Sequence, residues 1–137
     1  MPSERTRTHA QRAGDASESL VAERLTAEGW RILARNLRLG RKEVDLLAVD
    51  PGPVARLVIV EVRWRRSHDF GWPEETFDWR KRNHLRAAVG RLAELDRLPD
   101  GRPVPRLPIA IDLCIVEPGR NVGEGPIVRH HRDALAF

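Results

Sequence analysis

The hydrophobic pattern of the chain predicts two helices and five strands. Apolar residues recur at three- and four-residue spacing between positions 14 and 28, as expected for a helix that ends at Gly29. A second helix, from about Glu74 to Leu95, has a similar apolar stripe and carries acids in its first turn. Short apolar runs rich in β-branched residues predict strands at 30–37, 43–49, 57–63, 109–116 and 127–131. The order α-β-β-β-α-β-β implies an α/β fold with a mixed β-sheet flanked by helices.

The second and third of these strands are joined by a Pro/Gly turn and predict a β-hairpin. Asp45 and Glu61 lie at equal distances along the chain from Pro53 in this turn. A symmetric hairpin would therefore place them opposite each other, with their Cβ atoms about 4.5–5.5 Å apart. Glu43 would share the face of Asp45, and Arg63 the face of Glu61, because residues two apart on a strand point the same way.

Two opposed carboxylates on a sheet repel each other unless a proton or a cation lies between them. A divalent metal is one explanation, since Mg²⁺ and Mn²⁺ prefer carboxylate oxygens. Glu18, near the edge of the apolar stripe of the first helix, faces either this hairpin or water. The alternative is an edge hairpin whose acids point into solvent and pair with Arg41 or Arg56.

Composition fits one globular domain with a flexible basic arm. The 137 residues are 41% hydrophobic, with a formal charge of +4 and a pI near 10.4. Residues 1–12 are expected to form the arm, either touching nucleic acid or serving as a simple extension, and residues 13–137 the domain. The single cysteine, Cys114, excludes a disulfide within one chain. No signal peptide or membrane span is apparent, so we expect a cytoplasmic protein with no membrane partner.

A basic and aromatic stretch follows the hairpin. The residues that we expect to contact nucleic acid combine arginines for phosphates with a tryptophan for stacking on bases: Arg65, Arg66, Trp72, Arg80, Arg82 and Arg86. Trp64 and Trp79 lie in the same stretch. Four interspersed acids support the alternative, in which this is a solvated helix face with tryptophans capping the core.

Three further positions have more than one interpretation. Lys81 interrupts the apolar stripe of the second helix, so its ammonium either reaches the hairpin face or extends along the helix into solvent. His130 and His131 are adjacent on a strand and would point to opposite faces, which makes a poor metal site. Asp112 is either a buried acid that supports the sheet or a distant member of the site.

The acids on the first helix and the hairpin resemble the metal-binding skeleton of the PD-(D/E)XK nuclease superfamily. A wider match, over about residues 13–137, resembles the uncharacterised bacterial YraN-like family, whose fold is related to archaeal Holliday-junction resolvases. The matching residues are the run Glu18 to Gly29, Arg35-Asn36, Glu43-Val44-Asp45-Leu46-Leu47, Val60-Glu61-Val62-Arg63, Arg65, Ser67, Phe70-Gly71, Pro73, Lys81, Leu85, Ala87-Ala88 and the ending Ala134 to Phe137.

The resemblance implies a restriction-endonuclease-like domain that hydrolyses structured or branched DNA with Mg²⁺ or Mn²⁺, and a homodimer. Asp45 and Glu61 would hold the metal with Glu18 and Glu43. Arg63 stands where the family has lysine, and Lys42 where it usually has glycine. Because arginine keeps its charge but effectively never deprotonates, Arg63 could stabilise an oxyanion without acting as a base, and Lys81 could take over the lysine's place. The alternatives are a catalytically weakened nucleic-acid-binding module and a protein-interaction scaffold.

Overall fold

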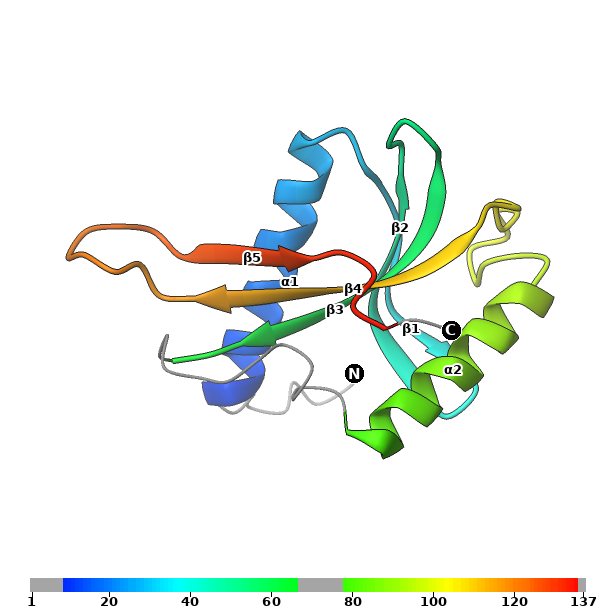
Figure 1. The fold of residues 1–137 in the computed structure, drawn as a ribbon, viewed down its shortest axis with the longest axis horizontal. Coiled ribbons are helices and arrows are strands. Elements are labelled where there is room, and N and C mark those ends of the chain that lie inside the picture. The colour runs from blue at the N-terminus through cyan, green and yellow to red at the C-terminus, as the bar shows by residue number, and fades with distance from the viewer. Residues whose placement is uncertain (1–8, 67–77, 136–137) are drawn as a thin grey trace, which may run out of the picture.

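The computed structural model describes residues 9–66 and 78–135 and contains one five-stranded sheet with two helices (Figure 1). The elements are α1 (His9–Ala27), β1 (Arg31–Leu39), β2 (Lys42–Asp50), β3 (Arg56–Trp64), α2 (Trp79–Glu94), β4 (Ile109–Glu117) and β5 (Ile127–His131). The strand order in the sheet is β1-β2-β3-β4-β5; β3 and β4 pair in parallel, and the other neighbours pair antiparallel. This is the mixed sheet, and the α-β-β-β-α-β-β order, that the sequence predicts.

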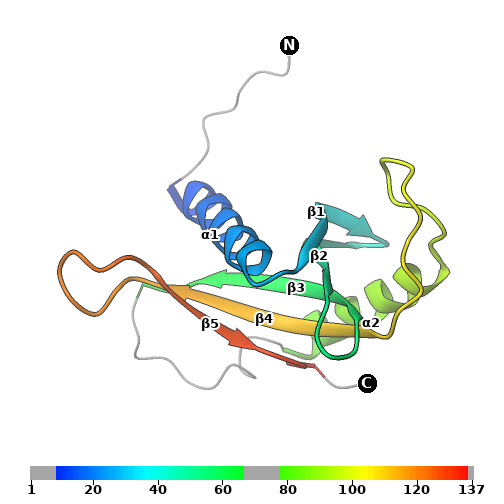
Figure 2. The ribbon, with the colours of Figure 1, turned by 90° about the horizontal axis from the view of Figure 1, so that it is seen from above.

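Each face of the sheet is covered by one helix. On one face, Val21 and Leu25 of α1 pack against strand residues such as Val58 and Val60, and Figure 2 shows α1 lying along this side of the sheet. On the other face, the buried stripe of α2 packs with apolar residues of β1 to β4 and consists of Leu85, Ala88 and Leu92. The sheet is buried on both sides at its centre, which explains the nearly continuous apolar run of β4.

The helix ends differ from those expected. The first helix begins at His9, so residues 9–12 of the predicted arm are helical. Gly29 terminates it with φ 93°, a conformation that glycine adopts at low cost. The second helix begins at Trp79, because Asp78 is extended and its carboxylate accepts a hydrogen bond from the Lys81 backbone N–H at 2.9 Å. The predicted start at Glu74 falls in 67–77, outside the described residues.

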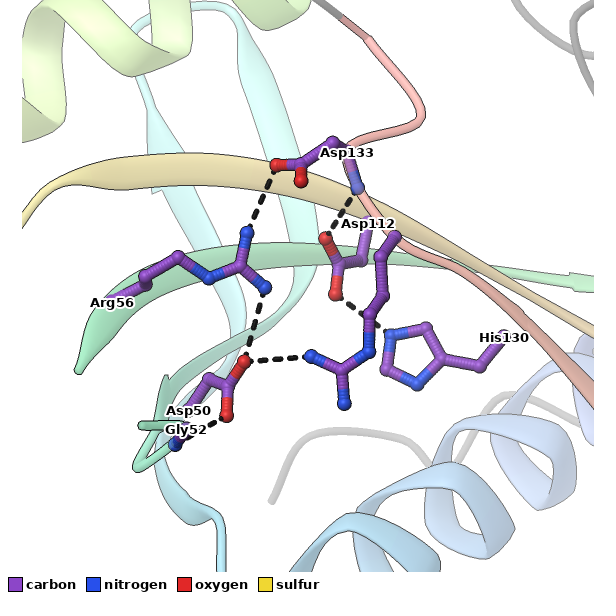
Figure 3. A network of polar contacts seen from close by, with 7 residues as sticks. Asp50, Gly52, Arg56, Asp112, His130 and Asp133 are labelled. Carbon is purple, nitrogen blue, oxygen red and sulfur yellow. Dashed lines mark hydrogen bonds and ion pairs between the residues drawn. The ribbon is translucent and has the colours of Figure 1, made fainter. Parts of the chain in front are cut away.

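A polar network ties the turn between β2 and β3 to the segment after β5 (Figure 3). Asp50, 3% exposed, accepts hydrogen bonds from the Gly52 backbone N–H and from two arginines, Arg56 at 3.0 Å and Arg132 at 2.8 Å. Burial alone would raise the pKa of Asp50, but these hydrogen bonds outweigh it and lower the pKa below its usual value. Arg56 therefore serves this network and does not pair with the acids near the middle of the hairpin.

Asp112 completes the network and is fully buried. One of its carboxylate oxygens lies 2.7 Å from His130 Nε2, and the other accepts the Asp133 backbone N–H at 3.0 Å. Arg56 reaches Asp133 at 2.9 Å, which closes the chain of contacts. Asp112 is therefore an acid that supports the sheet, one of the two interpretations left open by the sequence.

In the parts of the chain that the structure describes, no helix is long and apolar enough to cross a membrane.

Candidate functional site

The hairpin of β2 and β3 has the predicted register. Its paired residues run from Asp50 opposite Arg56 to Leu46 opposite Val60. Continuing this register by one residue places Asp45, which precedes Leu46, opposite Glu61, which follows Val60. The two acids are therefore neighbours across the hairpin, as their equal distances from the turn predict.

Asp45 uses its carboxylate to replace a bond of the β-ladder. Its Oδ2 atom accepts a hydrogen bond from the Val62 backbone N–H at 2.8 Å. The regular alternation of β2 is broken here, because Leu46 packs on the α1 side while Val44 packs on the α2 side. This irregularity lets the Asp45 carboxylate reach the backbone of β3 and holds it beside Glu61.

Glu61 is the most deeply buried acid of the site, with 2% of the residue exposed. Its Oε2 atom lies 3.2 Å from the ammonium of Lys42, while Oε1 is buried and has no hydrogen-bond partner. Burial, and then the charge of Asp45, raise the pKa of Glu61 to about 7, although Lys42 and Arg63 act in the opposite direction. A buried carboxyl with an unused oxygen is well suited to receive a cation.

Glu18 faces the hairpin from α1. Its Oε1 atom is buried without a hydrogen-bond partner. Partial burial and the nearby charge of Asp45 raise the pKa of Glu18 to about 7, while Arg35 opposes them. Glu43 also contributes to this rise, but its own side chain is 53% exposed and lies 3.9 Å from Arg38. Glu18 therefore joins Asp45 and Glu61, whereas Glu43 lies at the surface beside them.

The two cations expected at the site are placed differently. Arg63 lowers the pKa of Glu61, and its Nε atom is buried without a hydrogen-bond partner. Lys81 lies in the first turn of α2 and is partly buried. Within the described ranges, the lysine that contacts Glu61 is Lys42, so a role for Lys81 in the site stays a prediction.

Lys42 was not among the residues predicted for the site. It begins β2, next to the turn from β1, and its side chain is 18% exposed. Two features of the sequence point to it in retrospect. It is one of the two lysines among 24 basic residues, and it stands where the resembling family usually has glycine.

The acids fit a metal in their chemistry but do not form a complete cage. Across residues 9–66 and 78–135, no group of three or more His, Cys, Asp or Glu side chains is arranged to hold a metal ion. The carboxylates of Asp45 and Glu61 are nevertheless hard oxygen donors, and an oxygen of Glu61 is buried and unused. Mg²⁺ typically takes one or two carboxylates and completes its shell with water and substrate phosphates. A site of this open kind fits the residues present.

The basic and aromatic stretch is partly described. Arg66 lies over the ring of Trp64, 5.9 Å from its centroid, and Trp64 is 41% exposed. Trp79 at the start of α2 is 71% exposed, so neither tryptophan is a buried cap of the core. The other predicted contact residues are exposed or partly buried at the end of β3 and on α2, namely Arg65, Arg80, Arg82 and Arg86. Trp72 lies outside the described residues.

The adjacent histidines lie on opposite faces of the sheet, as predicted. His130 is paired with Cys114, which packs on the α1 side, and His131 with Leu113, which packs on the α2 side. His130 contacts Asp112 and the ring of Trp30, whose centroid is 5.5 Å away. This arrangement gives the two histidines no common ligand.

Fold and site together define an α/β protein with a cluster of partly buried acids between its first helix and a central hairpin. Residues 17–116 match the family described as "Uncharacterised protein family UPF0102". The chain belongs to this family, which is the YraN-like family that its motifs resemble.

Curated members of the family are similar over much of the chain. A UPF0102 protein of Symbiobacterium thermophilum is 42% identical over 110 residues, which cover 80% of this chain and 86% of that protein. A UPF0102 protein of Chlorobaculum parvum is 43% identical over 84 residues, 61% of this chain and 63% of that protein.

One solved structure is distantly similar. It is described as the structure of Pyrococcus furiosus SfsA in complex with Ca²⁺, with a TM-score of 0.42 and 17% sequence identity. The match covers 90% of this chain and 63% of that chain.

Proposed function

We propose that this protein is a metal-dependent phosphodiesterase that hydrolyses nucleic acid, with structured or branched DNA as its substrate. The observation that carries the proposal is the pair Asp45 and Glu61, held side by side on adjacent strands with Glu18 behind them. Buried acids with raised pKa values gather at functional sites more often than at purely structural positions.

Asp45 and Glu61 would hold Mg²⁺ or Mn²⁺, and Glu18 and Glu43 would support the ion directly or through water. When bound, the metal would polarise a phosphate oxygen and lower the pKa of a coordinated water. Arg63 would stabilise negative charge that develops on the phosphate, since a guanidinium remains charged at any working pH. The hydrogen bond from Val62 N–H would keep the Asp45 carboxylate in place during this process.

The basic surface would hold the substrate. Exposed arginines at 66, 80 and 86 would contact phosphates, and the exposed indoles of Trp64 and Trp79 would stack on unpaired or distorted bases. Base stacking is interrupted or distorted at a branch point, so the indoles would reach base faces there more readily than in a regular duplex, which favours branched DNA. A homodimer would present two such surfaces to one branched molecule, and light scattering of the purified protein would test this assembly.

The experiment is a cleavage assay with labelled duplex, single-stranded and four-way-junction DNA in Mg²⁺ or Mn²⁺. We expect cleavage by the wild type that is at least a hundredfold slower in Asp45→Asn and in Glu61→Gln. Asp100→Asn, which changes an exposed acid in the loop after α2, is the matched control and should cleave normally. Cleavage that persists in both site variants would refute the proposal.

A second candidate function is a nucleic-acid-binding module without catalysis, favoured by Arg63 because arginine does not act as a base. In that case the junction DNA would bind in a salt-sensitive manner, and no condition would cleave it. Absence of both binding and cleavage would instead favour a protein-interaction scaffold.

A further inference from the structure

Lys42 makes a shielded ion pair with Glu61 at the centre of the candidate site. The Nζ atom of Lys42 lies 3.2 Å from Glu61 Oε2. The two side chains are 18% and 3% exposed, so water screens this contact far less than a contact at the surface. Glu61 Oε1, the second oxygen of the same carboxylate, is buried and has no hydrogen-bond partner.

The ammonium of Lys42 therefore engages one of the two Glu61 oxygens that a divalent metal would use. A carboxylate oxygen in contact with an ammonium is a poor ligand for a metal, because the two cations repel each other at short distance. Asp45 alone would hold a metal less well, since its Oδ2 is already engaged by the Val62 backbone N–H. Any metal that uses both oxygens of Glu61 must displace Lys42.

We propose that Lys42 is an internal counter-cation that competes with the divalent metal for Glu61, and that its displaced ammonium binds a phosphate of the nucleic acid. This inference rests on the proposed function, because it concerns the same metal and the same substrate. Lys42 suits the role, since its ammonium is compact and sits on a flexible four-carbon chain. Arg63 is less suited to move from the acids to a phosphate, because its Nε atom is buried.

Two consequences follow from the competition. In the absence of nucleic acid, the protein holds metal weakly, because the metal must first break the contact between Lys42 and Glu61. When both are present, metal and nucleic acid strengthen each other's binding, since the metal releases Lys42 and the phosphate receives it. Such coupling is reciprocal by thermodynamic necessity.

The first test is Mn²⁺ binding by calorimetry at pH 8.5, where Glu61 is mostly ionised, without DNA. We compare wild type with Lys42→Met, which keeps the length of the side chain and removes its charge. Arg41→Met is the matched control, since Arg41 is the exposed neighbour and its replacement removes the same charge. We expect Lys42→Met to bind Mn²⁺ at least fivefold more tightly than wild type, and Arg41→Met to change affinity less than twofold.

The second test measures binding of a labelled DNA junction with and without Ca²⁺, by fluorescence anisotropy. Ca²⁺ should tighten binding by the wild type several-fold and by Lys42→Met less than twofold. Thermal melting verifies that each variant is folded, and Lys42→Gln replaces Lys42→Met if the latter is not.

The outcomes separate this inference from the proposed function. Equal or weaker Mn²⁺ binding by the folded Lys42 variant, with measurable binding by the wild type, would overturn the competition and leave the metal site intact. An equal gain in Arg41→Met would also overturn it, because the effect would then reflect net charge. If no protein binds Mn²⁺ and cleavage is absent, the proposed function itself fails.

Discussion

Replacing Glu61 by glutamine should make the folded protein more stable at alkaline pH. Burial and the charge of Asp45 raise the pKa of Glu61 from 4.5 to about 7, despite the opposing charges of Lys42 and Arg63. The folded state therefore binds the proton of Glu61 more tightly than the unfolded chain does. The resulting stabilisation is fully present below the unfolded pKa and is lost as the pH rises through about 7. Glutamine is neutral at every pH and does not suffer this loss.

The magnitude follows from the size of the shift. Each pKa unit corresponds to about 1.4 kcal/mol, so ionising Glu61 in the folded protein costs roughly 3 kcal/mol relative to the unfolded chain. This net cost already includes the attraction of Lys42 for the ionised carboxylate, which lowers the pKa. We therefore expect Glu61→Gln to raise the free energy of unfolding by about 3 kcal/mol at pH 8.5, and by less than about 1 kcal/mol at pH 5.

Urea denaturation at both pH values measures the effect directly. Glu43→Gln is the control on the same hairpin, because the Glu43 side chain is 53% exposed, and its stability should stay within about 0.5 kcal/mol of wild type. The prediction is wrong if Glu61→Gln is no more stable than wild type at pH 8.5, or if its gain in stability at pH 5 is equally large. Either result would mean that ionising Glu61 does not destabilise the folded protein.

Three further predictions concern other groups. Uptake of Mn²⁺ should increase steeply between pH 6 and 8, because Glu18 and Glu61 must both lose protons whose pKa values lie at about 7; a flat calorimetric profile would contradict this. Asp50→Asn should destabilise the protein by about 2 kcal/mol in urea denaturation, since it weakens hydrogen bonds to charged partners in a buried network, whereas the exposed Asp96→Asn should cost less than about 0.5 kcal/mol. Cys114 should not react with a thiol reagent in the native protein at pH 8, because burial raises its pKa to about 12; rapid labelling without denaturant would disprove this.

The hairpin could be predicted from sequence because its register depends on local features. A Pro/Gly turn and two β-branched runs of similar length determine which residues face each other. Counting residues from the turn is therefore enough to place Asp45 beside Glu61. The order of the elements along the chain, and hence a mixed sheet flanked by helices, follows similarly from the hydrophobic pattern. The start of α1 at His9 does not, because the sequence of its first turns has no large apolar residues at helical spacing and so leaves no periodic signal.

Side-chain contacts between residues that are not directly opposite each other on neighbouring strands could not be predicted. Extending the hairpin register would place Lys42 opposite Trp64 and not beside Glu61, so their ion pair depends on the local irregularity of β2 and on the depth of burial. The contact between His130 and Asp112 is similar, since His130 is paired with Cys114 and reaches Asp112 diagonally. Side-chain reach and strand bending determine such contacts, and neither is visible in residue spacing.

The parallel pairing of β3 and β4 has a consequence for how the chain folds. Three of the four candidate acids, Glu43, Asp45 and Glu61, lie on the hairpin of β2 and β3, where contacts are local and quick to form. β4 pairs with β3 after a long excursion through α2, so this pairing must overcome a large loop-closure entropy. We expect the amide protons of β4 to become protected from exchange later in refolding than those of β2. The acid cluster would then be assembled before the strand that buries its supporting sheet, and a newly made chain would expose its charged centre to solvent before its core is closed.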